Sequence, residues 1–329
     1  MGFQKRLSGA RKLMGVHGFD SFMLTAREDI FYYTGYKASD GNTLLIQKYG
    51  KPLLFVSPLE NDAESCRTTQ TVYLKSIDSL TKPLKGGLVG FDEFSLSANR
   101  FLNLHKHHVR LKKASALIKK PMEIKDEEEI EHMKKAISIT KKSLEATKIY
   151  GKKEIDVARK IEVGFRVNGG ETAFDTIVAN GTASIHHMPG NSKVRRDKTT
   201  IVDLGARYNW YCSDITRTYL GSSGWKSVWE DVKEMQEQII EAIRPGKTMD
   251  DLQKLYQSLM AKKKYKVYHS FGHGIGLVVH EQVTGLLKEN MVITAEPGVY
   301  LKHRGGVRIE DMVLVRKGKP LVLSKPIKY

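Results

Sequence analysis

Two aspartates, Asp203 and Asp214, lie in a stretch that reads as two short β-strands joined by a tight polar turn. The turn is predicted at Tyr208-Asn209, and with that loop the two aspartates face each other directly across the hairpin. Cβ atoms of directly opposed residues are about 4.5–5.5 Å apart, and like charges in such a pair destabilise the sheet. A divalent cation between the carboxylates is the simplest compensation, so this hairpin predicts a metal site.

A second acidic hairpin is predicted near the C-terminus, with its turn at Lys302-His303-Arg304-Gly305 and with Glu296 and Glu310 roughly opposite each other. Between the two hairpins the chain carries three histidines interleaved with glycines, namely His269, His273 and His280. Four carboxylates and one imidazole can hold two divalent ions about 3.5–4 Å apart, with carboxylates bridging them. Such a shell suits Mn²⁺, Co²⁺, Fe²⁺ or Zn²⁺, and the residue types do not choose among these metals.

Each of these residues also has an ordinary structural interpretation. Asp203 could be a surface aspartate near a turn, and Glu310 could be an edge charge paired with Arg308. Gly274 and Gly276 could let a phosphate approach the backbone, but the downstream glycine of a dinucleotide-binding motif is missing. Five residues of suitable type, each in the expected element and order, favour a metal site over five unrelated accidents.

The N-terminal third of the chain alternates short apolar runs with helical patterns, which is typical of an α/β layer domain. Buried strands are predicted at residues 22–24, 43–46, 52–56 and 87–91. Helices are predicted near residues 3–16, 59–66 and 96–106. No cluster of histidines and carboxylates occurs in this part of the sequence, so the chemistry is expected elsewhere.

The pattern changes at Lys119-Lys120-Pro121-Met122, and we place the domain boundary there, giving domains 1–120 and 121–329. A long amphipathic helix follows, opened by a capping-box-like pair, Asp126 and Glu129, and running toward Gly151. Three further helices are predicted, at residues 154–168, around 225–243 and after Thr248. Their apolar stripes are interpreted as core.

The net charge of +17 is spread over both halves of the chain and is not gathered in an arm or tail. A solvated lysine-rich surface is therefore expected, and nucleic acid is not an expected partner. No apolar run approaches the roughly 18 residues of a membrane span. Two cysteines and a basic start without an apolar core predict a cytoplasmic protein rather than a secreted one.

Taken together, the motifs resemble those of the pita-bread metallopeptidases: methionine aminopeptidase, aminopeptidase P and Xaa-Pro dipeptidase (prolidase). Five segments resemble the family's metal-ligand motifs, in the order VDLGA with Asp203, SDITRT with Asp214, HSFGHGIG with His273, AEPGVY with Glu296 and VRIED with Glu310. The resemblance implies an α+β protein. Its C-terminal pita-bread domain would hold a pseudo-twofold antiparallel sheet flanked by helices, preceded by a smaller α/β creatinase-N-like domain.

The resemblance extends to residues around the ligands. His186 resembles the substrate-site histidine ahead of the first hairpin, with His187 as its rival, and His280 resembles the second active-site histidine. His269 and Arg308 match positions on the prolyl side of the pocket in the proline-specific members. The stretch DIFYYTGY in the N-terminal half resembles the prolidase N-terminal domain, which methionine aminopeptidases generally lack, so the Xaa-Pro branch is favoured.

The resemblance implies hydrolysis of an N-terminal Xaa-Pro bond by two divalent ions, with Mn²⁺ or Co²⁺ first and Zn²⁺ or Fe²⁺ as alternatives. In this scheme Glu296 transfers protons, His280 stabilises the oxyanion and His186 holds the substrate backbone. The expected substrates are Xaa-Pro dipeptides or short peptides with proline second, and a homodimer is expected. Aminopeptidase P, methionine aminopeptidase and a non-catalytic pita-bread binding module are the alternatives.

Overall fold

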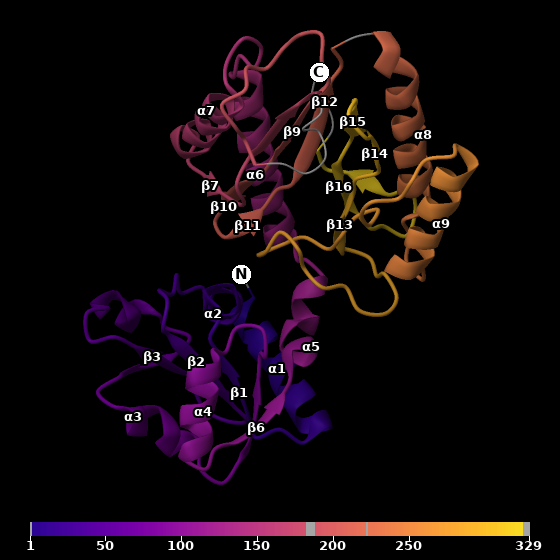
Figure 1. Cartoon of the computed structure of the whole chain (residues 1–329). Helices are drawn as coiled ribbons and strands as arrows, with labels where there is room; N and C mark the ends of the chain where they lie inside the picture. Colours follow the sequence, from indigo (N-terminus) through magenta and orange to yellow (C-terminus); the bar gives the residue numbers. More distant parts are fainter. Residues whose placement is uncertain (1, 182–187, 222, 325–329) are drawn as a thin grey trace. The chain divides into compact units, whose positions relative to one another are not determined.

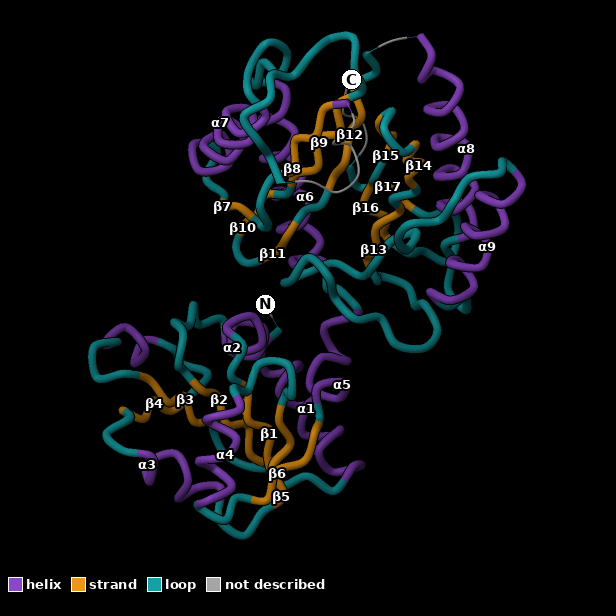
Figure 2. The backbone as a smooth tube through the Cα atoms, in the orientation of Figure 1, coloured by secondary structure: helices purple, strands orange, loops and turns teal. Residues whose placement is uncertain are grey.

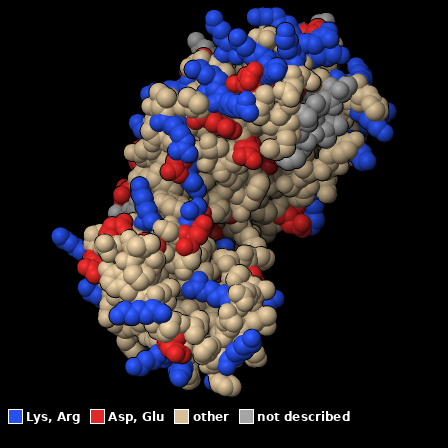
Figure 3. All heavy atoms as spheres, turned by 60° about the vertical axis from the view of Figure 1, so that its left-hand side comes forward, with Lys and Arg blue, Asp and Glu red and all other residues tan. Residues whose placement is uncertain are grey.

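The computed structural model describes residues 2–181, 188–221 and 223–324 and divides the chain into two compact units, Met1–Met122 and Glu123–Tyr329 (Figure 1). The boundary predicted from the sequence lies two residues before this division. None of the helices in the described ranges combines the length and hydrophobicity needed to span a bilayer. On the face drawn in Figure 3, lysine and arginine side chains are scattered over both units, with acidic side chains among them.

The N-terminal unit is a mixed six-stranded sheet with helices packed on it. The strand order is β4-β3-β2-β1-β5-β6. The strands are β1 (Ser21–Leu24), β2 (Thr43–Gln47), β3 (Leu53–Val56), β4 (Gln70–Tyr73), β5 (Leu88–Phe91) and β6 (Arg110–Lys113). The helices are α1 (Phe3–His17), α2 (Arg27–Thr34), α3 (Ile77–Thr81), α4 (Ala98–Lys106) and α5 (Ser115–Lys119), with short 3₁₀ turns at Asn61–Ser65, Lys82–Leu84 and Lys120–Glu123.

The predicted central strands of this unit are present, but its two edge strands, β4 and β6, were not predicted. β4 and β6 are short and polar, and three of the four residues of β6 are exposed. Edge strands often carry such side chains, because lysine at an edge discourages pairing with other chains. The helix predicted at 59–66 is only the 3₁₀ turn Asn61–Ser65.

The C-terminal unit contains two similar halves, each with a pair of helices against a set of antiparallel strands (Figure 1). In the first half α6 (Glu127–Glu145) contacts β10 and α7 (Glu154–Val167) contacts β8. In the second half α8 (Lys226–Ala242) contacts β13, β14 and β15 and packs on α9 (Met249–Lys262). The strands are β7 (Glu171–Thr172), β8 (Ile177–Asn180), β9 (Thr200–Leu204), β10 (Ala206–Tyr208), β11 (Tyr211–Cys212), β12 (Ile215–Tyr219), β13 (Val292–Ala295), β14 (Gly298–Leu301), β15 (Gly305–Arg308), β16 (Asp311–Leu314) and β17 (Leu321–Val322).

The starts of α6 and α9 follow from local chemistry. Asp126 and Glu129 form the predicted capping box at α6, and Thr248 with Asp251 forms another at α9. Each box satisfies two backbone N–H groups that the first helical turn would otherwise leave unpaired. α6 ends at Glu145, so the helix is shorter than the predicted one, which runs toward Gly151.

The turn of the first hairpin lies one residue later than predicted, which shifts the pairing register by two residues. Its turn is Asn209-Trp210, with φ of +45° and +72°, and not Tyr208-Asn209. A two-residue hairpin turn of this kind needs positive φ at both positions. Asn209 and Trp210 meet this condition, whereas Tyr208, the first residue of the predicted turn, lies in β10. Asp203 therefore pairs with Thr216, and the predicted direct opposition of Asp203 and Asp214 was wrong.

Asp214 nevertheless points to the same face of the hairpin as Asp203. It lies between β11 and β12, two residues before Thr216, and the hydrogen bond from the Ser213 N–H to the Ala206 carbonyl continues the same register there, so the alternation of side chains places it on that face. The two aspartates are thus diagonal neighbours, whose separation is about 7–8 Å in an antiparallel pair. In the second hairpin Ala295 pairs with Asp311 and Gly298 with Arg308, a register that sets the adjacent Glu296 and Glu310 opposite each other, as predicted.

Candidate metal centre

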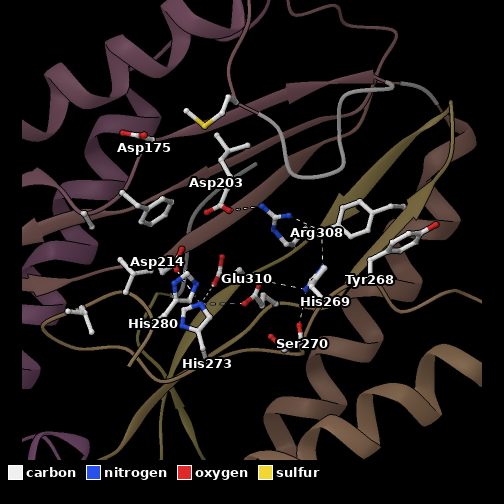
Figure 4. Close-up of a pocket in the computed structure, with 18 residues that line it drawn as sticks. Asp175, Asp203, Asp214, Tyr268, His269, Ser270, His273, His280, Arg308 and Glu310 are labelled. Atoms are coloured by element: carbon white, nitrogen blue, oxygen red, sulfur yellow. Dashed lines mark hydrogen bonds and ion pairs between the residues drawn. The ribbon is translucent and has the colours of Figure 1, made fainter. Parts of the chain in front are cut away.

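The two hairpins of the C-terminal unit bring their carboxylates together around one histidine (Figure 4). His273 Nε2 lies 3.5 Å from Asp214 Oδ2, 3.4 Å from Glu296 Oε1 and 4.0 Å from Glu310 Oε1. One ligand atom each of Asp214, His273 and Glu310 lie within 4.8 Å of one another. Residues separated by about 100 positions in the sequence are thus gathered at the centre of the unit.

His273 is held in the orientation that a metal ligand needs. Its Nδ1 lies 3.0 Å from the carbonyl oxygen of Gly274, so Nδ1 carries the proton and Nε2 presents a lone pair to the carboxylates. The backbone N–H of His273 donates to Thr294 Oγ1 at 3.0 Å, and its carbonyl accepts from the Thr294 N–H at 2.8 Å. Burial lowers the pKa of His273 to about 4, which keeps the imidazole neutral at physiological pH.

Three carboxylate oxygens in this cluster lack a conventional partner. Asp203 Oδ1, Asp214 Oδ1 and Glu310 Oε1 are buried and accept no hydrogen bond from any residue that the structure describes. An unpaired buried carboxylate oxygen is costly, because it has lost water without gaining a donor. Divalent cations would satisfy these oxygens, so the donor set fits metal ions.

The electrostatics of the cluster lead to the same conclusion. Burial, reinforced by the other carboxylates, raises the pKa of Asp214 and of Glu310 well above the ordinary value. Burial also raises the pKa of Glu296 to about 8, although Arg308 opposes the shift. Without a counter-cation these groups hold their protons to higher pH than ordinary carboxyl groups do, whereas a bound dication reverses the preference and keeps them ionised.

Arg308 ties the two hairpins together beside the carboxylates. Its Nη2 lies 2.5 Å from Asp203 Oδ2, and its Nη1 donates to the Tyr300 hydroxyl at 2.8 Å. Its Nε donates to Thr216 Oγ1 at 3.2 Å, and that hydroxyl donates to Glu310 Oε2 at 2.7 Å. The second oxygens of Asp203 and Glu310 are thereby oriented, which leaves the first oxygens free for a cation.

Thr216 and Tyr300 contact the predicted site residues directly and were not predicted from the sequence. A signal for Thr216 existed, because a hairpin turn placed one residue later sets it directly opposite Asp203. Tyr300 lies four residues after Glu296, and its hydroxyl accepts from Arg308 and lies 2.9 Å from His269 Nε2. No pattern in the sequence indicated that contact.

A second acidic residue beside the cluster is fully neutralised. Asp311, next to Glu310 in the chain, is buried and forms an ion pair with Arg217 at 2.8 Å. Its carboxylate also accepts from Ser324 Oγ at 2.6 Å and from Gln236 Nε2 at 3.2 Å. Arg217 in turn donates to the carbonyl oxygen of Glu310 at 2.7 Å. Both carboxylate oxygens of Asp311 thus accept hydrogen bonds from protein groups, and Asp311 is not counted among the candidate metal ligands.

The carboxylates open into a cavity of about 960 Å³. His269 and Arg308 line one part of it, together with Tyr268 and Tyr300, and His280 lines another, with its ring centroid 4.3 Å from that of His273. His186 and its rival His187 lie outside the described residues. The structure thus places all the other predicted site residues around one cavity, which is large enough for a dipeptide.

Comparisons with known proteins match both units. The model of metallopeptidase family M24 matches residues 131–317, and that of the creatinase/prolidase N-terminal domain matches residues 6–120. The chain is 34% identical to the Xaa-Pro dipeptidase of Pyrococcus furiosus over 98% of both chains.

Solved structures agree with these matches. The chain is similar to the prolidase from Pyrococcus horikoshii, with a TM-score of 0.91 and 32% identity over 98% of both chains. It is also similar to the X-Pro aminopeptidase from Thermotoga maritima, with a TM-score of 0.87 and 30% identity over 96% of this chain and 97% of that one. The expected fold, a creatinase-N-like domain followed by a pita-bread domain, is confirmed.

Proposed function

Because this chain belongs to metallopeptidase family M24, we propose that it is a dinuclear metal-dependent Xaa-Pro dipeptidase. The observation that carries the proposal is the cluster of four carboxylates around His273, with three buried oxygens that accept no hydrogen bond from the described residues. The similarity to an Xaa-Pro dipeptidase over 98% of both chains supports the choice of substrate.

In this proposal five residues hold the two ions: Asp203, Asp214, His273, Glu296 and Glu310. Bound ions of this kind lower the pKa of a water molecule and polarise the scissile carbonyl. Glu296 is the residue proposed to move protons, because it lines the cavity and a bound dication would keep its carboxylate ionised and able to accept one. It takes a proton from the attacking water and returns it to the leaving prolyl nitrogen.

The other residues of the cavity orient the substrate. His280 donates a hydrogen bond to the oxygen of the scissile carbonyl as negative charge develops there. Arg308 spends three of its five N–H groups on Asp203, Tyr300 and Thr216, so two remain to bind the carboxylate of the prolyl residue. His269 lies beside it through the shared contact with Tyr300. His186 is proposed to hold the substrate backbone.

Glu296→Gln is expected to lower kcat by about 10²- to 10⁴-fold, because the amide cannot take a proton from the attacking water. The change keeps the shape of the side chain, so the folded structure should persist. The measurement is kcat on an Xaa-Pro dipeptide at saturating metal, with bound metal counted in the same sample. Glu289→Gln, at a half-exposed position paired with Lys317, is the control and should leave kcat unchanged. A loss of less than threefold for Glu296→Gln would contradict its role.

The proposed function is tested by hydrolysis of Ala-Pro, Met-Pro and Leu-Pro with added Mn²⁺, Co²⁺ or Zn²⁺ and with chelator. A dipeptidase cleaves these dipeptides and leaves Ala-Pro-Ala intact, whereas aminopeptidase P cleaves the tripeptide. Aminopeptidase P is the second candidate, because the chain is also similar to an X-Pro aminopeptidase over nearly its whole length. Release of methionine from Met-Ala-Ser without cleavage of Xaa-Pro bonds would instead indicate a methionine aminopeptidase.

The identity of the metal, the oligomeric state and the cellular location are further parts of the proposal. We propose Mn²⁺ or Co²⁺ as the metal, which elemental content and reactivation of the metal-free enzyme would test. A homodimer and a cytoplasmic location also stay predictions, which light scattering and fractionation can decide. A non-catalytic binding module would show no hydrolysis and no stoichiometric metal.

A further inference from the structure

His280 is carried by a segment that has no helix or strand of its own. Residues 274–284 run from the proposed ligand His273 through His280. The β-bridges of Gly274 with Glu281 and with Ile293 hold the start of this loop, and the Gly276 carbonyl accepts the backbone N–H of Cys212 at 2.7 Å. The Glu281 N–H donates to the Gly274 carbonyl at 2.8 Å. Apart from the bridge to Glu281, these contacts hold the first residues of the loop, and the imidazole of His280, which must be aligned with the reacting carbonyl, needs support of its own.

The support comes from the carboxylate of Glu281, the residue after His280. Glu281 Oε1 accepts the backbone N–H of Leu277 at 3.0 Å, which folds the loop around the carboxylate. The fold is tight: a Cβ added to Gly276 would lie 2.2 Å from Glu281 Oε1. Glu281 Oε2 forms an ion pair with the ammonium of Lys125. Only 2% of the Lys125 side chain and 10% of the Glu281 side chain are exposed.

Lys125 is itself anchored where the chain enters the C-terminal unit. Its backbone N–H donates to the carbonyl of Asn290 at 2.9 Å, and its ammonium lies 3.4 Å from the carbonyl of Glu123. Glu123 Oε1 accepts from both the backbone N–H and the hydroxyl of Thr284, at 3.1 and 2.7 Å. The short segment 123–125 therefore grips the loop twice, at Glu281 and at Thr284.

We propose that Lys125 is a positioning residue that sets His280 against the substrate carbonyl through its buried ion pair with Glu281. The inference rests on the proposed function, in which His280 stabilises the oxyanion. Lys125 does not line the cavity, so it can act on His280 only indirectly, and its ion pair with Glu281 is the direct contact with the loop. Without the ammonium, the buried Glu281 carboxylate is left uncompensated and draws toward water, which reorients the loop and the imidazole next to it.

Lys125→Met is expected to lower kcat by about 10- to 100-fold, in line with the cost of small misplacements of a catalytic group. KM and bound metal should change less than threefold, because neither the metal ligands nor Arg308 touch Lys125. In a His280→Ala background the same change should lower kcat less than threefold, since the group being positioned is already gone. Lys125→Arg keeps the positive charge and should restore much of the activity.

A matched control breaks an ion pair of similar kind in the other unit. Lys119→Met removes the partner of the buried Asp92, 2.9 Å away in the N-terminal unit, and should lower the melting temperature without changing kcat. A kcat loss for Lys125→Met that is equally large in the His280→Ala background would overturn the positioning role, as would an unchanged kcat. Should Lys125→Met fold poorly, Glu281→Gln is read in the same cycle with His280→Ala, under the same criteria.

A readout other than activity separates this inference from the proposed function. In protein labelled with ¹⁵N-histidine, the ring signals of His280 are assigned by their absence in His280→Ala. Lys125→Met should shift these signals, while Lys119→Met should leave them in place. If the wild type cleaves no Xaa-Pro dipeptide but Lys125→Met still shifts the His280 signals, the proposed function is refuted. The positioning of His280 by Lys125 then still holds. Unmoved His280 signals in Lys125→Met would overturn the link itself.

Discussion

Asp214→Asn is expected to lower kcat/KM by on the order of 10³-fold and, at the same time, to make the metal-free protein more stable. The loss of activity follows from the loss of a charged metal ligand at the centre of the cluster. The gain in stability follows because Asp214 is buried among Glu310, Asp203 and Glu296, and burial and repulsion raise its pKa well above the ordinary value. A neutral amide of the same shape removes that repulsion.

The expected gain is about 1–3 kcal/mol in the free energy of unfolding, measured at pH 8 with chelator present. For a protein of this size this corresponds to several degrees in melting temperature. With metal added the order should reverse, because the wild type gains binding energy that the variant has largely lost. A metal-free variant less stable than the metal-free wild type would contradict the proposed repulsion.

Asp311→Asn provides the matched comparison, because Asp311 is equally buried but is paired with Arg217, Ser324 and Gln236. Neutralising Asp311 removes the negative charge that compensates the buried Arg217 guanidinium. This should lower the free energy of unfolding by about 3 kcal/mol or more. The two substitutions make the same chemical change close together in one unit and are expected to have opposite effects on the metal-free protein. Thermal unfolding of both variants at one pH is a sufficient measurement.

Removal of the metal is expected to abolish hydrolysis and to leave a protein that becomes less stable as pH rises from 6.5 to 8. The raised pKa values of Asp214, Glu296 and Glu310 mean that the folded, metal-free protein holds protons that the unfolded chain has released. Wherever the folded state binds more protons, the free energy of unfolding falls with rising pH. For Glu296 the penalty is complete only above its folded pKa of about 8.

The lower limit of this pH window is set by His273. Its pKa of about 4 in the folded state lies below the unfolded value, so its contribution to stability increases with pH up to about 6.5 and opposes the carboxylates there. Above that pH only the carboxylates of the cluster act. Metal binding should give the opposite slope, because deprotonated carboxylates bind cations more tightly as pH rises.

The measurement is thermal unfolding at pH 6.5, 7.2 and 8.0, with chelator and with excess Mn²⁺. The Asp214→Asn variant serves as the reference for titration elsewhere in the chain, and its metal-free slope should be smaller than that of the wild type. Equal slopes for the two metal-free proteins would exclude the carboxylate cluster as the source of the pH dependence.

Some helix starts, the second hairpin and the types of the candidate ligands are determined by short stretches of the sequence. The capping boxes at α6 and α9 are predictable because each involves residues three positions apart. The opposition of Glu296 and Glu310 across the second hairpin was also predicted from the sequence. The observed pairing of β13 with β16 and of β14 with β15 agrees with it. The residue types that could bind metal were identified because acidic pairs on bare strands are unfavourable without a cation.

Only the tertiary structure decided how these pieces meet. The turn at Asn209-Trp210 depends on two residues adopting positive φ, which composition did not reveal, and it changes the partner of Asp203 to Thr216. Arg308 reaches Asp203 across 105 residues of chain, and Lys125 reaches Glu281 across 156. Such contacts carry no periodic signal in the sequence. Their strength comes from burial of opposite charges, and burial exists only after distant segments have packed together.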